Sequence, residues 1–346
     1  MKKCRMFILI GFSFFSISLS HADLGFYRPW NSPHDRNRRT LPEAHTPLNL
    51  VRARAAAIQI IEGNEFPVNS SGVTISKDGY VLTAAHVVEG CLRDHGMLNV
   101  LSEGKNKILE TLNSTPNVVC DNLSSPSFTG RVPTLVYVGR GVAQWPDLEN
   151  ISPEFIQKIK STQDDFAILK FPGHKASKCI PIARNLELKT GDLLWGIGFP
   201  GATYRGPEDD NGFPDSDGQD QFISYGKIYP DITHNAYYTT IYPTFVEARH
   251  IHYTQKMLDL NRELLSGSNL VISNIDLFFG MSGSPGINEA GDLVALNVGT
   301  SVPNRAVGYY FYVDGASVSV RLSSILQELD LNVGELKRRE FFNCAP

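Results

Sequence analysis

The chain of 346 residues has no excess of basic residues. Its 32 Lys and Arg face 36 Asp and Glu, a formal charge of −4. Lys2, Lys3 and Arg5 all lie in the first 22 positions, which hold no acid, so the rest of the chain has a balance of −7. Neutralising nucleic-acid phosphates requires a positive surface. Nucleic acid is therefore not an expected partner.

Long apolar runs are lacking after residue 22. The run from Met6 to Leu19 follows a short cationic start and falls short of the roughly 20 residues that span a bilayer. Ser20 and Ala22 then place small residues where a signal peptidase cleaves. We predict that residues 1–22 are a signal peptide rather than a membrane anchor. The protein is then periplasmic or secreted, with no membrane span.

Cysteines are few, and none of them forms a closely spaced pair. Cys4 leaves with the signal peptide, and Cys91, Cys120, Cys179 and Cys344 remain. An even number in an exported chain predicts disulfides. Three pairings are open, of which we favour the first cysteine with the second and the third with the fourth. A zinc site is disfavoured because such sites usually contain a C-x₂₋₄-C pair.

The composition of the chain after the signal peptide changes at about residue 55. Residues 23–54 are rich in Pro, Arg, Asn and His and predict an extended arm or a propeptide. From residue 55, short β-prone runs recur between Gly, Asn and Asp, which predicts an all-β antiparallel fold, a barrel or a sandwich. The runs are 57–61, 72–76, 80–83, 134–138, 165–171, 192–198, 269–275, 292–298 and 309–313.

Three segments depart from the strand pattern. Residues 206–221 carry six acidic residues among Gly and Pro and predict an exposed loop. Residues 244–265 have a helical apolar spacing, and this helix either packs on the strands or roofs a cleft. A last helix is expected over about 319–329.

The acidic loop raises the question of calcium. Asp215, Asp217 and Asp220 resemble part of an EF-hand loop, but Phe213 and Ser224 stand where that motif needs acids. A solvated loop is favoured, with a looser calcium site as the alternative. We therefore predict no metal site.

Two segments bring together a histidine and a carboxylate. In Gly79–Val87 a β-run ends in two alanines and then His86, which lets the ring turn toward a cleft. Asp165 directly precedes the apolar run 166–169 and so lies at the edge of a core, with Asp164 as the adjacent rival. A buried carboxylate needs a hydrogen-bond donor, and a histidine N–H supplies one.

The third segment is Phe279–Pro285. Gly280 and Gly283 permit a tight turn around Ser282, which can aim the N–H groups of Gly280 and Ser282 at one point as an oxyanion hole. A serine hydroxyl needs a base to accept its proton, and a carboxylate orients that base. The three segments together predict nucleophilic catalysis, although each alone has an ordinary structural explanation.

These segments, in the order His, Asp, Ser, resemble those of trypsin-like (chymotrypsin-fold) serine peptidases. The resemblance is nearest to the bacterial HtrA-type, glutamyl-endopeptidase and dipeptidyl-peptidase branches, and it covers residues 55–331 in outline. It implies two antiparallel six-stranded β-barrels, at about 55–175 and 176–331, with an insertion at 206–268. It assigns His86 as base, Asp165 as its orienter and Ser282 as nucleophile.

The chain departs from the family in three ways. Asp165 follows His86 by 79 residues and Ser282 follows Asp165 by 117, so long loops should rim the cleft. Met281 stands where digestive members carry an acid that pairs with a newly cut N-terminus, so that activation is not expected here. Residues 332–346 form only a tail, too short for a PDZ domain.

Substrate-binding residues are expected by the same likeness. Asp276 lies six residues before Ser282, where an acid in trypsin-like members selects Lys or Arg. Asn297, Val298 and Gly299 are expected to pair with the substrate backbone, and Gly315 to line the opposite wall of the pocket.

The predicted function is a serine endopeptidase that acts on proteins or peptides without a cofactor. Two alternatives are open. One is a catalytically silent binding protein on the same scaffold, and the other is an exopeptidase whose cleft is blocked at one end by the insertion. The sequence makes no prediction of oligomeric state.

Overall fold

The computed structural model describes residues 47–63, 68–97, 118–139, 165–173, 176, 178–199, 221–228, 269–273, 275, 277, 280–300 and 317–344. The predicted signal peptide, residues 206–220 of the acidic loop, the helix over 244–265 and the strand over 309–313 lie outside these residues, as do Asp164, Asp276 and Gly315. Within the described ranges, no helix combines the length and apolarity needed to cross a membrane.

Seven antiparallel strands form the first sheet, in the order β4-β6-β7-β3-β2-β1-β5. The edge strands β4 (Val118–Val119) and β5 (Leu123–Ser124) are joined by residues 120–122 alone. In this turn Leu123 N–H donates to Cys120 O at 2.9 Å, so the two edges of the sheet are drawn together into a barrel. The other strands are β1 (Ala57–Glu62), β2 (Val68–Thr74), β3 (Tyr80–Thr83), β6 (Thr134–Val138) and β7 (Ala167–Lys170).

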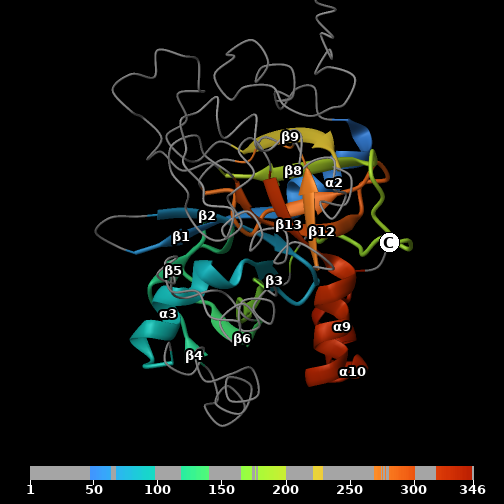
Figure 1. Cartoon of the computed structure of the whole chain (residues 1–346). Coiled ribbons are helices and arrows are strands. Elements are labelled where there is room, and N and C mark those ends of the chain that lie inside the picture. The colour runs from blue at the N-terminus through green and yellow to red at the C-terminus, as the bar shows by residue number, and fades with distance from the viewer. Residues whose placement is uncertain are drawn as a thin grey trace, which may run out of the picture.

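Six antiparallel strands form the second sheet, in the order β10-β13-β12-β11-β8-β9. An antiparallel bridge between Ile228 and Ser273 joins the ends of its two edge strands, which closes this sheet as well. Its strands are β8 (Leu193–Gly198), β9 (Phe222–Lys227), β10 (Leu270–Ser273), β11 (Pro285–Ile287), β12 (Leu293–Thr300) and β13 (Ser317–Arg321). Figure 1 shows this sheet above the first one.

The continuous apolar runs in the sequence form β3 and β7, two central strands of the first sheet. All four residues of β3 are buried, and so are the first three of β7, because both faces of these strands are covered. The predicted all-β antiparallel fold is confirmed. The first sheet has seven described strands rather than six, since the turn at Cys120 divides one segment into two short strands that join opposite edges.

The expected extended arm is wrong for residues 47–54. A 3₁₀ turn, η2 (Leu48–Leu50), leads into helix α2 (Val51–Ala56). Leu50, Ala53 and Ala56 are fully buried at a spacing of three, which puts them on one helix face. Arg52 and Arg54 hydrogen-bond from the same helix to Cys179 O and to Gln221.

The C-terminal region also differs from the prediction. Strand β13 continues to Arg321 because Ser317 and Ser319 alternate inward and donate to Ile275 O and Asn297 Oδ1 at 2.5 and 2.7 Å. Helix α9 (Leu322–Asn332) therefore starts later than expected. The predicted tail holds a further helix, α10 (Glu335–Phe341).

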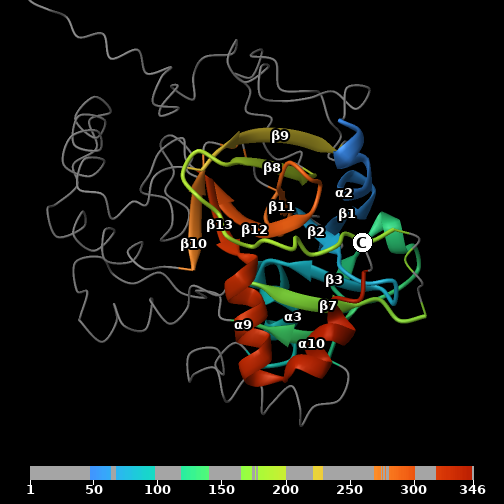
Figure 2. The ribbon, with the colours of Figure 1, turned by 90° about the vertical axis from the view of Figure 1, so that its right-hand side faces the viewer.

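Helices α9 and α10 connect the two sheets. They follow β13 of the second sheet but lie beside β3 and β7 of the first, as Figure 2 shows. Tyr137 Oη on β6 donates to Glu328 Oε1 on α9 at 2.8 Å, and the ring of Phe341 on α10 packs on Tyr80 with 5.1 Å between centroids. The helices thereby hold one sheet against the other.

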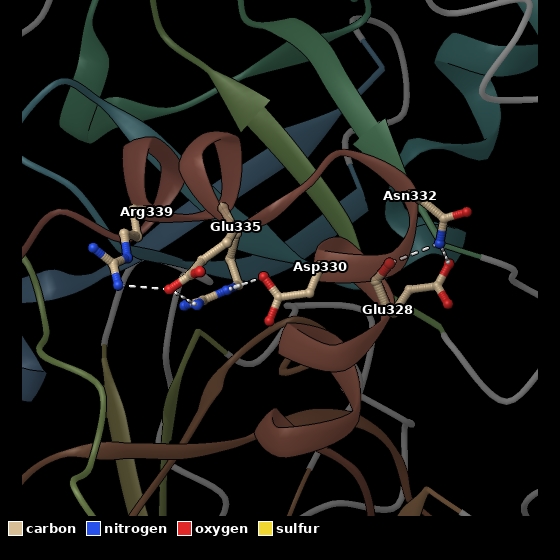
Figure 3. Close-up of polar contacts among 6 residues, drawn as sticks. Glu328, Asp330, Asn332, Glu335 and Arg339 are labelled. Carbon is tan, nitrogen blue, oxygen red and sulfur yellow. Dashed lines mark hydrogen bonds and ion pairs between the residues drawn. The ribbon is translucent and has the colours of Figure 1, made fainter.

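Polar contacts define the turn between these two helices. Asn332 Nδ2 donates to Glu328 at the end of α9, and Arg338 Nε on α10 pairs with Asp330 at 2.6 Å (Figure 3). Arg339 pairs with Glu335 within α10. Such exposed pairs contribute little stability each, so the buried contacts above carry the attachment.

Both disulfides have the favoured pairing. Cys91 bonds Cys120 across a Cα–Cα distance of 5.0 Å, which ties helix α3 (Glu89–Asp94) to the turn that closes the first sheet. Cys179 bonds Cys344 across 5.7 Å and anchors the end of the chain to the segment between the two sheets. The predicted pairing is confirmed.

A close approach at Gly283 joins the two sheets where β3 ends. Gly283 has φ +85°, and a Cβ atom on it would lie 2.1 Å from Ser71 O, 2.3 Å from Thr83 Oγ1 and 2.9 Å from Ala84 N. Its own N–H donates to Asn297 O at 2.7 Å. Only glycine fits both this backbone conformation and this space. We call the contact of Gly283 with Ser71, Thr83 and Ala84 the seam.

Replacing Gly283 tests the seam. Gly283→Ala should lower the free energy of unfolding by about 1–3 kcal/mol more than Gly191→Ala, since it adds overpacking to backbone strain. Gly191 is the matched control because it has φ +87° and no atom lies within 4 Å of the place that an added methyl group would take. Urea unfolding of both variants measures the difference, and equal losses would show that the seam is not tightly packed.

Candidate active site

His86 projects from a short turn between buried neighbours. Strand β3 ends at Thr83, Ala84 is extended, and the 3₁₀ turn η3 (Ala85–Val88) begins directly after it. Ala84 and Ala85 are buried, as are the two valines that follow the histidine, whereas the His86 side chain is 38% exposed. The small and apolar neighbours fix the turn and leave the imidazole at the surface of the core.

Asp165 holds His86 at two points. Its Oδ2 lies 2.8 Å from His86 Nδ1, and its Oδ1 accepts the backbone N–H of His86 at 3.1 Å. The Asp165 side chain is only 6% exposed. With the Nδ1 proton donated to the carboxylate, Nε2 is left as the proton acceptor of a neutral ring. The structure therefore brings together the predicted histidine and carboxylate.

Carboxylates around His86 change its pKa. Burial by itself lowers the pKa of the imidazole, but Asp165, with Glu89 and Glu62 contributing further, outweighs burial and raises it above the usual value. Burial raises the pKa of both Glu62 and Glu89 as well, against the opposing effect of His86. The protonated imidazole is thus favoured by its surroundings.

The seam places Ser282 near His86. The next residue, Gly283, lies against Thr83 and Ala84, and His86 follows only two residues after Ala84. Ser282 O accepts the N–H of Ser71 at 2.9 Å. Its hydroxyl has one hydrogen-bond partner in the described part of the chain, Val298 O at 3.4 Å. Among the described residues, this hydroxyl therefore forms no hydrogen bond with the imidazole.

The turn around Ser282 points its carbonyl groups into the protein. Gly280 has φ +93°, and its carbonyl accepts the Ser71 hydroxyl at 2.7 Å. The carbonyls of Gly280 and Ser282 are therefore both held by Ser71. The N–H groups of Gly280 and Ser282 have no hydrogen-bond partner among the described residues.

Met281 anchors this turn by burial. Its side chain is 0% exposed and belongs to an apolar cluster with Ile275, Leu277 and Val294. An acid at this position would need a buried positive partner, whereas methionine fills the apolar cavity without one. Met281, which replaces the acid found in digestive family members, is thus a packing residue.

The predicted substrate-binding strand divides into two parts. Asn297 is wrong as a substrate contact, because its side chain is fully buried and bonds Ser284 Oγ, Pro285 O and Ser319 Oγ. Its backbone N–H donates to Ser284 O, and its backbone C=O accepts the N–H of Gly283. Val298 and Gly299 lie at a β-bulge against β13.

Sequence reasoning missed Ser71, Glu62 and Glu89. Ser71 lies within β2 and has no motif around it that indicates a role. Glu62 ends β1, and only the fold brings its charge near His86. Glu89 opens α3 three residues after His86, so the local spacing could have indicated its role. Among the described residues there is no group of three or more metal-ligating side chains.

Comparison with known proteins gives a family match and a likeness to solved structures. A family model described as Trypsin-like peptidase domain matches residues 70–296. A serine endoprotease from Yersinia pestis is similar at 16% identity and a TM-score of 0.40, over 84% of this chain and 68% of that one. No curated protein sequence matches the chain.

The family match covers about two thirds of the chain and runs from β2 to β12. It includes His86, Asp165 and Ser282 in that order. The chain therefore belongs to the trypsin-like peptidase domain family and is a serine-type peptidase.

Proposed function

We propose that this protein is an exported serine endopeptidase that forms an acyl-enzyme on Ser282. The observation that carries the proposal is the two-point hydrogen bond between His86 and Asp165, next to the seam that seats Ser282. An oriented imidazole beside a serine on a tight turn is the arrangement that nucleophilic catalysis requires.

The proposed reaction has two steps. The Ser282 hydroxyl oxygen attacks the carbonyl carbon of the peptide bond while His86 Nε2 accepts its proton, and His86 then gives that proton to the leaving amine. A water molecule next attacks the acyl-enzyme, with His86 again accepting and returning a proton. Asp165 stabilises the charged imidazole in both steps. The N–H groups of Gly280 and Ser282 would bind the oxyanion.

Export is supported by two features. The cationic start and apolar run of residues 1–22 have the form of a signal peptide. The two disulfides, in which Cys91, Cys120 and Cys179 are buried, are bonds that persist in oxidising compartments. We propose a periplasmic or secreted location on these grounds.

Substrate contacts are proposed at four positions. Val298 and Gly299 would pair with the substrate backbone. The register shift between Asn297 and Gly299 leaves Val298 without a partner on β13, whereas Gly299 pairs with Val318. Asp276 and Gly315 are proposed from their positions in the sequence alone, Asp276 as a selector for Lys or Arg. Protein or peptide chains are the proposed substrates, and no cofactor takes part in the mechanism.

One observation favours a second function, a catalytically silent binding protein on the same scaffold. The Ser282 hydroxyl donates to Val298 O rather than to the imidazole among the described residues. In peptidases without substrate, however, catalytic hydrogen bonds are often long and tighten only when substrate binds. Chemical reactivity of Ser282 separates the two functions.

Ser282→Ala tests the nucleophile. The purified chain without its signal peptide should react with a fluorophosphonate probe, because His86 activates the hydroxyl that the probe modifies. Ser282→Ala should lose this label completely, while the matched Ser284→Ala, which removes a buried hydroxyl bonded to Asn297, should keep it. A folded wild-type protein that does not react would favour the silent scaffold.

Glu89→Gln tests the charge around His86. Acylation requires neutral His86, so kcat/KM should fall as the pH drops through the raised pKa of this group. Removing the negative charge of Glu89 lowers that pKa, and the acid limb of the pH profile should therefore move to lower pH. Glu187→Gln is the control, because this exposed residue pairs only with Lys189 among the described residues. An unmoved limb in Glu89→Gln would contradict the assigned cause.

A further inference from the structure

Every polar group of Ser71 forms a hydrogen bond at the seam. Its N–H donates to Ser282 O at 2.9 Å, and its C=O accepts the hydroxyl of Thr83 at 2.8 Å. Its own hydroxyl donates to Gly280 O at 2.7 Å and accepts the N–H of Phe199 at 2.9 Å. Its exposure is 0%, so water cannot replace these contacts.

The place of Ser71 in the first sheet explains its backbone contacts. Pairing between β2 and β3 stops at Gly72 and Thr83, because the chain then turns away into η3 with His86. Ser71 precedes Gly72 in β2, so its N–H and C=O have no backbone partner on β3. The turn around Ser282 and the Thr83 hydroxyl take those positions instead. The pairing of β2 with β3, the strand that leads to His86, thus ends at the residue next to the one that binds the Ser282 turn.

The Ser71 hydroxyl adds a contact that a side chain without a hydrogen-bonding group would lack. It joins Gly280 O of the Ser282 turn to Phe199 N–H at the end of β8, and a Cβ on neighbouring Gly198 would lie 2.8 Å from it. The backbone contacts of Ser71 survive most substitutions, but this bridge does not. Without it, Gly280 O loses a buried donor and Phe199 N–H loses a buried acceptor.

We propose that Ser71 is a positioning residue that sets the oxyanion hole against His86. It holds the carbonyls of Gly280 and Ser282, the same two residues whose N–H groups would bind the oxyanion. The proposal rests on the proposed function, since it requires that Ser282 is the nucleophile. Ser71 touches neither His86 nor the reacting atoms, so it acts through the backbone of the turn.

The test compares Ser71→Ala with wild type in peptide hydrolysis, with kcat counted per fluorophosphonate-reactive site. The kcat of the variant should fall by about 10-fold, and by less than the roughly 100-fold or more that losing a whole oxyanion donor costs. KM should stay within about two-fold and the acid limb of the pH profile should not move, because the hydroxyl contacts neither the substrate nor His86. Ser71→Thr, which keeps a hydroxyl, should restore most of kcat.

Ser76→Ala is the matched control. Ser76 is also fully buried, and its hydroxyl accepts two N–H groups, from Asp78 and Tyr80 at 3.1 and 3.2 Å, in the turn between β2 and β3. This variant should lose thermal stability while keeping kcat. If Ser71→Ala does not accumulate in a folded form, Ser71→Cys keeps the side-chain volume while replacing the hydroxyl with a weak thiol donor, and its kcat is also expected to fall.

Two results would overturn the proposal. One is a wild-type kcat in a folded Ser71→Ala protein, and the other is an equal loss of kcat in Ser76→Ala, which would reflect general destabilisation. Failure of the proposed function gives a different result, because wild type itself would then neither react with the probe nor hydrolyse peptides.

Discussion

The packing of Gly283 against the first sheet is the contact on which the site depends. His86 follows β3 of that sheet and Asp165 precedes its β7, whereas Ser282 comes from a turn that leads into the second sheet. A residue without a side chain lets the turn approach Ser71, Thr83 and Ala84 closely enough for the two halves of the site to meet. The chemistry is therefore assembled across a boundary, and every element that holds the two sheets together also holds the site together.

Several of those elements lie far from the site. Helix α9 leaves the second sheet and hydrogen-bonds the first through Glu328 and Tyr137, and the bond between Cys179 and Cys344 secures the end of the chain. Helix α2, which precedes β1, also links the first sheet to other parts of the protein. Its Arg52 and Arg54 hydrogen-bond to Cys179 and Gln221, which lie outside that sheet. Rigid docking of this kind suits a site in which a displacement of about one ångström lowers the rate substantially.

The electrostatic setting of His86 has two sides. Asp165 orients the ring and leaves Nε2 available, but it also favours the protonated form, as Glu62 and Glu89 do. In the proposed reaction a charged imidazole cannot accept the serine proton. The same charges that would stabilise the imidazolium during that reaction would therefore lower the activity at low pH. Met281 contributes no charge to this balance, and the Ser282 turn is held by apolar burial and by Ser71.

The sequence alone determined the residue types and their order: a histidine after two alanines, an aspartate before an apolar strand, and a serine between glycines. It also predicted the all-β class from local patterns and two disulfides from the even number of cysteines, but it left three pairings open, and the structure selects the favoured one. The tertiary structure decided that the Ser71 hydroxyl holds the Ser282 turn, that Asn297 is buried, and that Glu62 lies near His86. Those properties arise between segments far apart in the chain, as in the contact of Ser71 with Gly280 across 209 positions. No local pattern encodes such a contact, because the packing of one sheet against the other brings its partners together.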